Sequence, residues 1–205
     1  MKALLLVDIQ NDFIPGGALP VPDGDAIIPV VNDLMSYFDL VVATQDWHPQ
    51  NHGSFASNHP GKKVYDVIEL NGLQQILWPD HCVQGSKGAD FAPGLNTNPV
   101  EAIFRKGTDP GIDSYSGFFD NGRKKSTALA DYLRGRQIDE VYVVGLAGEF
   151  CVNFTILDAV DQGFKTYLIE DGTRPLNKDD FEKAKANMKA KGVGIITSNE
   201  IVKNG

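Results

Sequence analysis

The sequence predicts a single-domain three-layer α/β fold, in which a six-stranded parallel sheet is flanked by helices. Apolar runs alternate with helical patterns along most of the chain, which is typical of a parallel sheet with helices on both faces. Runs such as VYVV at 141–144 are apolar at consecutive positions, as in strands buried on both faces. The length of 205 residues and the 42% hydrophobic content suit one domain with its own core.

The first half of the chain is expected to hold two strands, a helix and a long insertion. The strands are Ala3–Ile9 and Leu40–Thr44, both apolar runs. Asp25 is expected to cap a helix that runs through Tyr37, with Pro29 tolerated in its first turn. Periodicity then fails from residue 49 to 98, and a connection of this length is usually functional. We therefore expect a single domain over 1–205 with an insertion around 45–98.

The second half is expected to continue the alternation. The expected elements are a strand at Glu101–Phe104, a helix capped by Ser126 and ending at Arg136, a strand at Glu140–Leu146, a helix at Cys151–Asp161 closed by Gly163, a strand at Lys165–Glu170, a helix at Asp179–Lys191 capped by Asn177, and a strand at Val193–Ser198. Gly145 and Gly148 give the backbone freedom for a sharp turn before Cys151. The turn therefore places Cys151 beside the end of a central strand.

Charge and composition exclude several classes of partner. The net charge of −8 and the pI near 4.9 argue against nucleic acid and anionic membrane surfaces. The N-terminal apolar run is too short for a signal peptide, and no run reaches transmembrane length. Two cysteines in 205 residues do not form a disulfide framework. We therefore expect a soluble cytoplasmic protein; the sequence does not decide whether it is a homo-oligomer.

Four polar residues follow the ends of expected parallel strands. They are Asp8, Asp46, Lys106 and Cys151, and topology should bring them to one edge of the sheet. There Asp8 can act as general base for a Cys151 nucleophile, with Lys106 favouring both anions. A helix N-terminus would also lower the pKa of the thiol. Taken singly, each has a plainer interpretation: a buried inert cysteine, a loop carboxylate or a surface lysine.

The histidines are clustered. All four of the chain lie between residues 48 and 81. In an extended segment Asp46 and His48 share a face, and His81 would complete a divalent metal site with open positions for water. The alternative is local hydrogen bonding in turns, which we prefer for His59 and favour for His52.

Aromatic residues lie on loops near the same polar edge. Phe13, Trp78 and Tyr115 could sandwich a flat ring, since aromatic stacking is favourable and directional. Their more common role is in small satellite cores. Both interpretations stay open on the sequence.

The motifs together resemble those of the nicotinamidases, which belong to the isochorismatase-like cysteine hydrolase superfamily. The matching pieces are VDIQNDF at 7–13, DWHP at 46–49, LWPDHCV at 77–83, RKG at 105–107 and GLA with FCV at 145–147 and 150–152. They occur in order between residues 1 and about 200. One departure is GEF at 148–150, where relatives often read Thr-Asp-Tyr, which puts any contact from a tyrosine hydroxyl there in doubt.

The resemblance implies an amidohydrolase with a catalytic triad of Asp8, Lys106 and Cys151. The reaction would convert nicotinamide into nicotinate and ammonia through a cysteine thioester, as part of NAD salvage. Pyrazinamide is an expected second substrate. The family also carries a cis peptide at the position of Leu146–Ala147, and the backbone N–H groups of Ala147 and Cys151 would form the oxyanion hole.

The resemblance further implies one divalent metal ion per chain. Zinc is the expected ion, and iron and manganese also occur in the family. Asp46, His48 and His81 would hold it, with waters completing the shell. The substrate ring would pack against Phe13 and Trp78, and Tyr115 and Ala147 would also contact the substrate.

Three questions stay open at this point. Some relatives carry a fourth protein ligand near the position of His52, and the sequence does not resolve its role here. A sister amidase would keep the triad but lose the DWH and WPDHC motifs, which are present. A non-catalytic flavodoxin-like binding module would leave the coexistence of Lys106 and Cys151 at strand ends unexplained.

Overall fold

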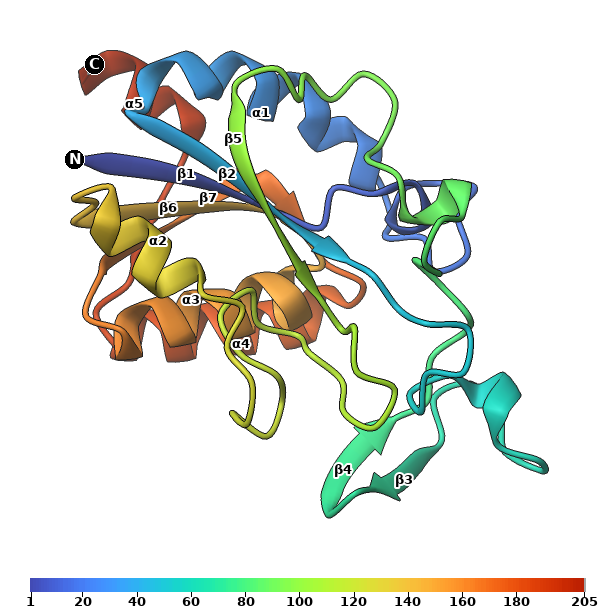
Figure 1. Cartoon of the computed structure of the whole chain (residues 1–205). Coiled ribbons are helices and arrows are strands. Elements are labelled where there is room, and N and C mark those ends of the chain that lie inside the picture. The colour runs from blue at the N-terminus through green and yellow to red at the C-terminus, as the bar shows by residue number, and fades with distance from the viewer. Residues whose placement is uncertain (205) are drawn as a thin grey trace.

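The computed structural model describes residues 1–204, and within them six parallel strands form the central sheet (Figure 1). The strands are β1 (Lys2–Val7), β2 (Leu40–Asp46), β5 (Val100–Lys106), β6 (Glu140–Leu146), β7 (Lys165–Arg174) and β8 (Gly194–Ile196). Their spatial order is β5-β2-β1-β6-β7-β8. This confirms the predicted fold class.

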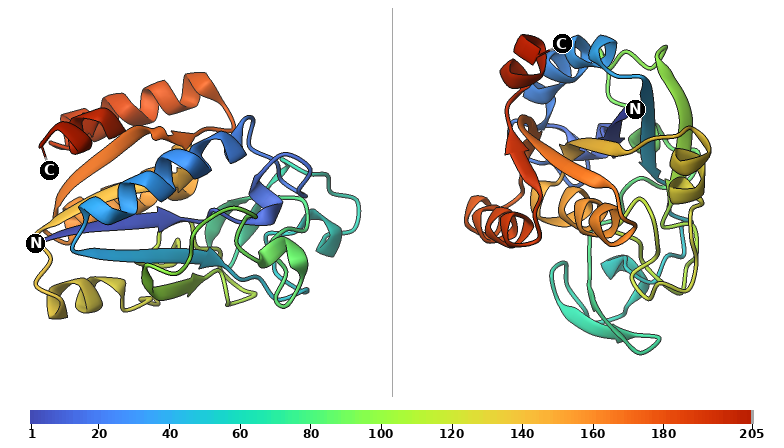
Figure 2. Two further views of the ribbon diagram at one scale, coloured as in Figure 1. Left: turned by 90° about the horizontal axis from the view of Figure 1, so that it is seen from above. Right: turned by 90° about the vertical axis from the view of Figure 1, so that its left-hand side faces the viewer.

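Helices cover both faces of the sheet, which makes three layers (Figures 1 and 2). On one face lie α1 (Ile27–Leu34) and α5 (Ser198–Asn204), which contact each other and β7. The other face carries α2 (Leu129–Gly135), α3 (Asn153–Asp161) and α4 (Lys178–Ala190). Short 3₁₀ turns occur at Asn11–Phe13, Gly24–Ala26, Met35–Tyr37, Ala56–Asn58 and Lys87–Ala89.

The consecutive apolar residues of the strands feed two separate cores. Along β1, Leu4 and Leu6 pack with the α1 side, while Leu5 and Val7 pack with the α2–α4 side. All four side chains are completely buried. Because successive side chains of a strand point to opposite faces, a strand covered on both faces must be apolar at every position. Burying one such side chain contributes roughly 1.5–3 kcal/mol.

The helix caps that the sequence predicts are partly wrong. Asp25 lies within a 3₁₀ turn, and α1 follows Ala26 without a side-chain cap. Ser126 does not cap α2, because its Oγ accepts from the N–H of Ala128 two residues later and closes a local turn. Asn177 is confirmed as a cap: its side-chain oxygen accepts from the backbone N–H groups of Asp179 and Asp180, the second and third residues of α4.

The insertion contains a β-hairpin that the sequence analysis did not predict. It pairs β3 (Val67–Leu70) with β4 (Leu73–Ile76) in antiparallel register. The two-residue turn is Asn71-Gly72, and both residues have positive φ (50° and 87°), as a hairpin turn of this length requires. The helix α5 was also not predicted, because its residues follow a short strand without a strong apolar period.

The chain turns sharply after β6, at the place where Cys151 begins the next segment. Gly145 has φ of 127°, and a Cβ there would lie 2.0 Å from the carbonyl oxygen of Val7, so a side chain does not fit. A π-helical turn at Gly148–Val152 then leads into α3. The expected helix start at Cys151 is therefore two residues early, and Cys151 lies in the π-turn. The Leu146–Ala147 peptide bond is cis, as the resemblance implies.

No helix within residues 1–204 is long and apolar enough to cross a membrane.

Candidate active site

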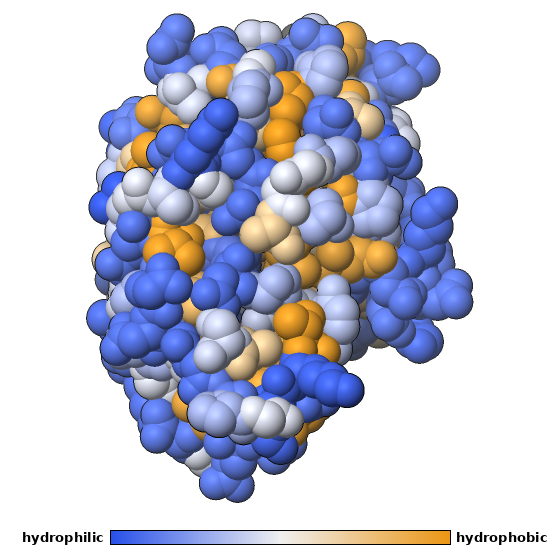
Figure 3. Space-filling model, turned by 90° about the vertical axis from the view of Figure 1, so that its right-hand side faces the viewer, coloured by the Kyte–Doolittle hydropathy of each residue, from blue (hydrophilic) through white to orange (hydrophobic). Residues whose placement is uncertain are grey.

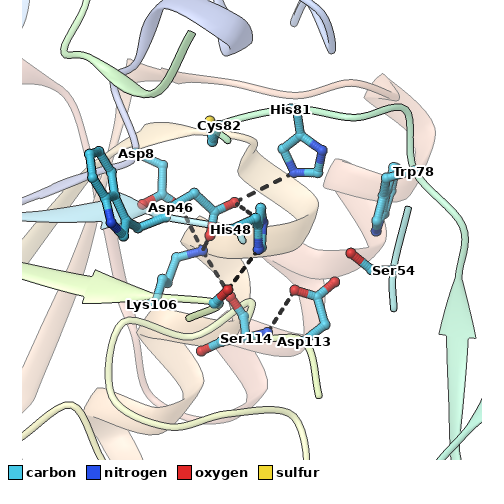
Figure 4. A network of polar contacts seen from close by, with 12 residues as sticks. Asp8, Asp46, His48, Ser54, Trp78, His81, Cys82, Lys106, Asp113 and Ser114 are labelled. Atoms are coloured by element: carbon cyan, nitrogen blue, oxygen red, sulfur yellow. Dashed lines mark hydrogen bonds and ion pairs between the residues drawn. The ribbon is translucent and has the colours of Figure 1, made fainter. Parts of the chain in front are cut away.

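The strand order brings the four predicted strand-end residues together. Lys106 ends β5, Asp46 ends β2 and Asp8 follows β1, while Cys151 lies in the turn after β6. These four strands are consecutive neighbours in the sheet. The polar side chains therefore meet at its carboxyl edge, where open α/β sheets bind ligands. Figure 4 shows three of them, Asp8, Asp46 and Lys106, pointing toward one another.

Lys106 is the centre of the cluster. Its Nζ lies 2.9 Å from Asp8 Oδ2, 2.7 Å from Asp46 Oδ1 and 3.4 Å from Cys151 Sγ. It also donates to the carbonyl oxygen of Ser114 at 2.8 Å. Burial would lower the pKa of Lys106, but the carboxylates of Asp46 and Asp8 outweigh it and raise that pKa well above its usual value. Lys106 therefore stays protonated and supplies one fixed positive charge.

Asp8 is held from the neighbouring strand. Thr44 donates from its hydroxyl to Asp8 Oδ1 at 2.6 Å, and the backbone N–H of Asp8 donates back to Thr44 Oγ1 at 3.2 Å. Asp8 has φ of 49°, a left-handed conformation uncommon outside glycine, which fits the clustering of backbone strain at functional sites. Its other oxygen pairs with Lys106 by charge at 2.9 Å but outside hydrogen-bond geometry. That oxygen is therefore able to accept a proton.

Burial reverses the expectation that the pKa of the Cys151 thiol is lowered. Cys151 is 7% exposed, and desolvation raises the pKa of its thiol well above the usual value, although Lys106 opposes this. The pKa of Asp8 is also raised, because desolvation outweighs the attraction of Lys106. Since the resting cysteine is a thiol, a base must remove its proton during attack. Asp8 is placed for this, with its carboxylate within 4.8 Å of Cys151 Sγ.

The three predicted metal ligands also converge. Asp46 Oδ2 lies 3.2 Å from His48 Nε2 and 3.6 Å from His81 Nε2 (Figure 4). The other ring nitrogen of each histidine faces a backbone carbonyl: His48 Nδ1 is 2.9 Å from Gly107 O, and His81 Nδ1 is 2.7 Å from Pro79 O. All three ligand residues are buried.

These residues fit a divalent cation. A carbonyl oxygen can only accept, so each Nδ1 carries a ring hydrogen, and in the neutral imidazole Nε2 then directs a lone pair toward Asp46. Two lone pairs and a carboxylate facing one point repel one another unless a cation lies between them. The backbone bond of the remote nitrogen is also the usual support of a metal-binding histidine. One carboxylate and two imidazoles suit zinc and similar ions with open positions for water or substrate.

Two features that the sequence analysis missed position these ligands. Gln10 is buried and bonds to both backbone groups of Asp46: its Nε2 donates to the carbonyl at 2.9 Å and its Oε1 accepts from the N–H at 2.8 Å. Gly107 has φ of 65°, and a Cβ there would lie 2.3 Å from the His48 ring. Glycine at 107 therefore lets the ring approach its carbonyl partner. Gln10 lies in the motif VDIQNDF and Gly107 in the motif RKG. These motifs were the signal in the sequence that could have identified both residues.

A small pocket joins Cys151 to two of the candidate metal ligands, Asp46 and His81. The residues lining it are Phe13, Leu19, Asp46, Trp78, His81, Asp113, Tyr115, Ala147, Phe150, Cys151 and Leu176. All four residues that the sequence predicts for substrate contact are among them: Phe13, Trp78, Tyr115 and Ala147. The sequence analysis missed Leu19, Asp113 and Leu176, which loops remote in sequence bring in, and it gave no pocket role to Phe150, which lies beside Cys151 in the π-helical turn.

The aromatic wall of the pocket is fixed by its own contacts. Trp78 packs edge-on against Phe150, with ring centroids 5.0 Å apart, and donates from Nε1 to the hydroxyl of Tyr115 at 3.2 Å. Tyr115 also receives a hydrogen bond from Gln75 of β4 at 3.3 Å. Phe150 carries no hydroxyl, so the wall is apolar at that position. Such a wall suits a flat aromatic ring.

The remaining cysteine and histidines do not join the cluster. Cys82 is a free thiol with no exposed surface, and burial raises its pKa well above the usual value. His59 contacts the carbonyl of Gly53 at 2.7 Å, which is the local bond expected for it. His52 is buried against His48, but it is not within 4.8 Å of Asp46 and His81 as a ligand set requires.

The carboxyl edge of the sheet opens onto one side of the molecule. Figure 3 shows that side, where apolar residues form small patches among a mainly hydrophilic surface. The insertion also carries exposed apolar side chains, including Tyr65 and Val67. The pocket is therefore approached across loops that follow the strands.

The isochorismatase domain family matches this chain over residues 2–200. Among curated proteins, the nicotinamidase of Escherichia coli (strain K12) is 50% identical over 197 residues, covering 94% of this chain and 92% of that protein. The chain therefore matches the family along nearly its full length.

Solved structures give the same result. The Acinetobacter baumanii nicotinamidase and pyrazinamidase has a TM-score of 0.95 at 50% identity, covering 98% of this chain and 97% of that chain. The yeast nicotinamidase bound to the inhibitor nicotinaldehyde has 0.90 at 35% identity, covering 96% and 100%. The pyrazinamidase of Pyrococcus horikoshii in complex with zinc has 0.79 at 41% identity, covering 96% and 98%.

Proposed function

The chain belongs to the isochorismatase family, and we propose that it is a nicotinamidase that hydrolyses nicotinamide to nicotinate and ammonia through a thioester on Cys151. The observation that carries the mechanism is the contact of Lys106 Nζ with both Asp8 and Cys151, at 2.9 and 3.4 Å, beside a pocket with an aromatic wall. Pyrazinamide, a related aza-aromatic carboxamide, is a second substrate, as the name of the A. baumanii protein suggests.

The reaction begins with the Cys151 thiol, because burial keeps it protonated. Asp8 takes the proton as Sγ attacks the carboxamide carbon, and Lys106 offsets the negative charge that forms. The backbone N–H groups of Ala147 and Cys151 would donate to the oxyanion. When the C–N bond breaks, Asp8 returns the proton to the departing ammonia, leaving a thioester.

Water completes the cycle. Asp8, ionised again, takes a proton from a water molecule that attacks the thioester carbon. The C–S bond breaks, nicotinate is released, and the sulfur regains a proton from Asp8. Each proton thus passes through one carboxylate whose pKa lies above the usual aspartate value, which matches a group that must both accept and donate.

Asp46, His48 and His81 would hold one divalent cation, and the zinc in the P. horikoshii structure supports zinc as its identity. When bound, the cation would supply a positive contact that orients the substrate ring. Phe13, Trp78 and Tyr115 would pack against that ring. Their apolar faces exclude water from it.

Ammonia release by purified, zinc-loaded protein tests this function. Wild-type protein should release ammonia from nicotinamide and from pyrazinamide, and Cys151→Ala should release none from either. Asp46→Ala and His81→Ala should lose bound zinc and bind substrate more weakly. If loaded wild-type protein released no ammonia from nicotinamide, the assigned substrate would be wrong; zinc retained by both metal variants would remove the metal site instead.

A further inference from the structure

One buried nitrogen beside the metal ligands takes no part in the mechanism above. His52 has no exposed surface, and its Nε2 has no hydrogen-bond partner among the atoms of residues 1–204. Leaving a buried polar group unpaired costs about 1–3 kcal/mol. Native proteins therefore give such a group a partner, often an ordered water. The surroundings of His52 indicate which kind of partner fits.

The hydrogen of His52 can be placed from its contacts. The backbone N–H of Ser54 donates to His52 Nδ1 at 3.2 Å, and the hydroxyl of Ser54 lies 2.7 Å from the same nitrogen. A backbone N–H can only donate, so Nδ1 must carry a lone pair. A neutral imidazole with its lone pair on Nδ1 has its hydrogen on Nε2. The unpaired Nε2 of His52 is therefore a donor.

His48 and His81 have the opposite arrangement. Each places Nδ1 against a carbonyl oxygen, of Gly107 and Pro79, so their hydrogens are on Nδ1 and their Nε2 atoms are free to bind a cation. His52 offers no such lone pair on the side away from Ser54. The three neighbouring histidines thus divide into two ligands and one donor.

Asp113 provides the matching acceptor. It is buried, and its carboxylate lies within 4.8 Å of ring nitrogens of both His48 and His52. Its oxygens accept from the N–H of Ser114 at 2.8 Å and from Gln75 Nε2 at 3.0 Å. An ionised carboxylate has about four acceptor positions, so capacity remains. Figure 4 shows Asp113 and Ser54 on the side of His48 that faces away from Asp8.

The position between these groups suits water better than a second cation. Neither nitrogen of His48 is available for it, because Nδ1 faces Gly107 O and Nε2 faces the first cation site beside Asp46. The Nε2 of His52 presents a hydrogen, which repels a cation. A ring nitrogen of His52 and a carboxylate oxygen of Asp113 lie within 4.8 Å of each other, a separation that one water with two ordinary hydrogen bonds can bridge.

We propose that His52 is a hydrogen-bond donor and not a metal ligand, and that His52 and Asp113 together hold one water molecule beside the metal site. Asp113 also lines the substrate pocket with Asp46 and His81. By holding the Asp113 carboxylate, this water fixes the direction in which that carboxylate faces the open side of the metal site. Both are positioning residues, because they act through the water. The inference rests on the metal site of the proposed function and not on the identity of the substrate.

Cobalt substitution of the full-length protein tests this inference, since the d–d spectrum of bound Co²⁺ reports its ligands. His52→Gln keeps an N–H donor but removes the imidazole, so both its spectrum and its cobalt affinity should match those of wild type. His52→Leu removes the donor; its spectrum should stay the same while cobalt affinity falls about tenfold, as for other supporting partners of metal ligands. His59→Gln, a histidine of the same insertion, is the control and should change neither quantity.

A double variant tests the shared water. If His52 and Asp113 act through one molecule, His52→Leu with Asp113→Asn should weaken cobalt binding no more than the stronger single change. A spectrum of His52→Gln that shifts as that of His81→Gln does would make His52 a ligand and overturn the inference. Additive losses in the double variant would overturn the shared water. Absence of cobalt binding in wild type would refute the metal site and this inference together, whereas failure to hydrolyse nicotinamide would touch only the proposed substrate. His52→Gln by itself tests whether His52 is a metal ligand. The inference can therefore still be overturned if His52→Leu does not fold.

Discussion

At the scale of single residues, the site depends on the buried ammonium group of Lys106, which three acidic groups share. Lys106 contacts Asp8, Asp46 and Cys151, and the pKa values of the three respond differently. Burial tends to raise the pKa of Asp46, but Lys106 and His48 hold that pKa well below its usual value, while the pKa values of Asp8 and Cys151 are raised. Asp46 therefore stays ionised as a ligand, whereas Asp8 can exchange protons.

The two cysteines should differ sharply in alkylation. Cys151 lines the pocket beside Lys106, whereas Cys82 is completely buried, so a small electrophile should label Cys151 much faster. Because the pKa of the Cys151 thiol is raised, its labelling rate should still be rising at pH 9, as thiolate forms. Peptide mapping by mass spectrometry at several pH values measures both. Faster labelling of Cys82, or a rate already constant below pH 7, would contradict the geometry.

The pH dependence of kcat/KM should carry the signature of Asp8. The free enzyme needs this carboxyl ionised, so activity should fall as pH drops through its pKa. An ordinary aspartate titrates at about 3.9. Since the pKa of Asp8 is raised above that value, the acid limb of the profile should lie above pH 4. Asp8→Asn should abolish turnover while substrate still binds. An acid limb below pH 4 in the zinc-loaded enzyme would exclude Asp8 as the base.

At the scale of elements, glycine positions control how closely segments approach. Gly107 follows β5, and its carbonyl accepts from the His48 ring that follows β2. This contact ties the metal ligand to the neighbouring strand. Its geometry depends on a backbone with φ of 65° and on the lack of a side chain.

Gly107→Ala should therefore weaken metal binding without touching any ligand. The added Cβ would lie 2.3 Å from the ring of His48, and the left-handed backbone would cost roughly 1–2 kcal/mol of folding free energy. Gly135→Ala is the matched control, because no atom lies within 4 Å of its Cβ position and it ends α2, where alanine is favourable. Urea unfolding and zinc affinity measure the two effects. Equal behaviour of the variants would show that the contact is unimportant.

The sequence predicted the elements whose signals are local. Consecutive apolar residues identified the six strands, and the strand-end rule located Asp8, Asp46, Lys106 and Cys151. The hairpin was missed although Asn71-Gly72 between two short runs is a strong local signal, because its strands are only four residues long and mix polar with apolar side chains.

Other features depend on contacts between remote segments and could not be read from local patterns. Thr44 reaches Asp8 from another strand, and Asp113 enters the pocket from a loop. The pKa of Cys151 was predicted in the wrong direction, because a helix start is visible in the sequence but the burial of the thiol is not. Long-range packing decides that balance.

At the scale of the whole molecule, the candidate metal ligands connect the sheet to the insertion. Asp46 ends β2, whereas His81 lies within the insertion, whose hairpin reaches the pocket wall through Gln75. A bound cation would therefore cross-link two parts of the fold that otherwise meet through loops. Binding to the native state alone also raises overall stability.

Chelation of the metal should loosen the insertion selectively. Amide hydrogen exchange should accelerate around residues 79–84, while β1 and β6, buried at the centre of the sheet, should exchange as slowly as before. Mass spectrometry of zinc-loaded and chelated protein measures this. Equal acceleration in the central strands, or none near His81, would contradict a metal that joins the two parts.

The most direct test of the central claim is the covalent intermediate itself. Zinc-loaded wild-type protein, mixed with nicotinamide and quenched in acid within milliseconds, should carry a nicotinoyl group on the peptide that contains Cys151 and none on the peptide that contains Cys82. Cys151→Ala should show no adduct and form no nicotinate. Nicotinate produced at the wild-type rate by Cys151→Ala, with no adduct in either protein, would contradict the account.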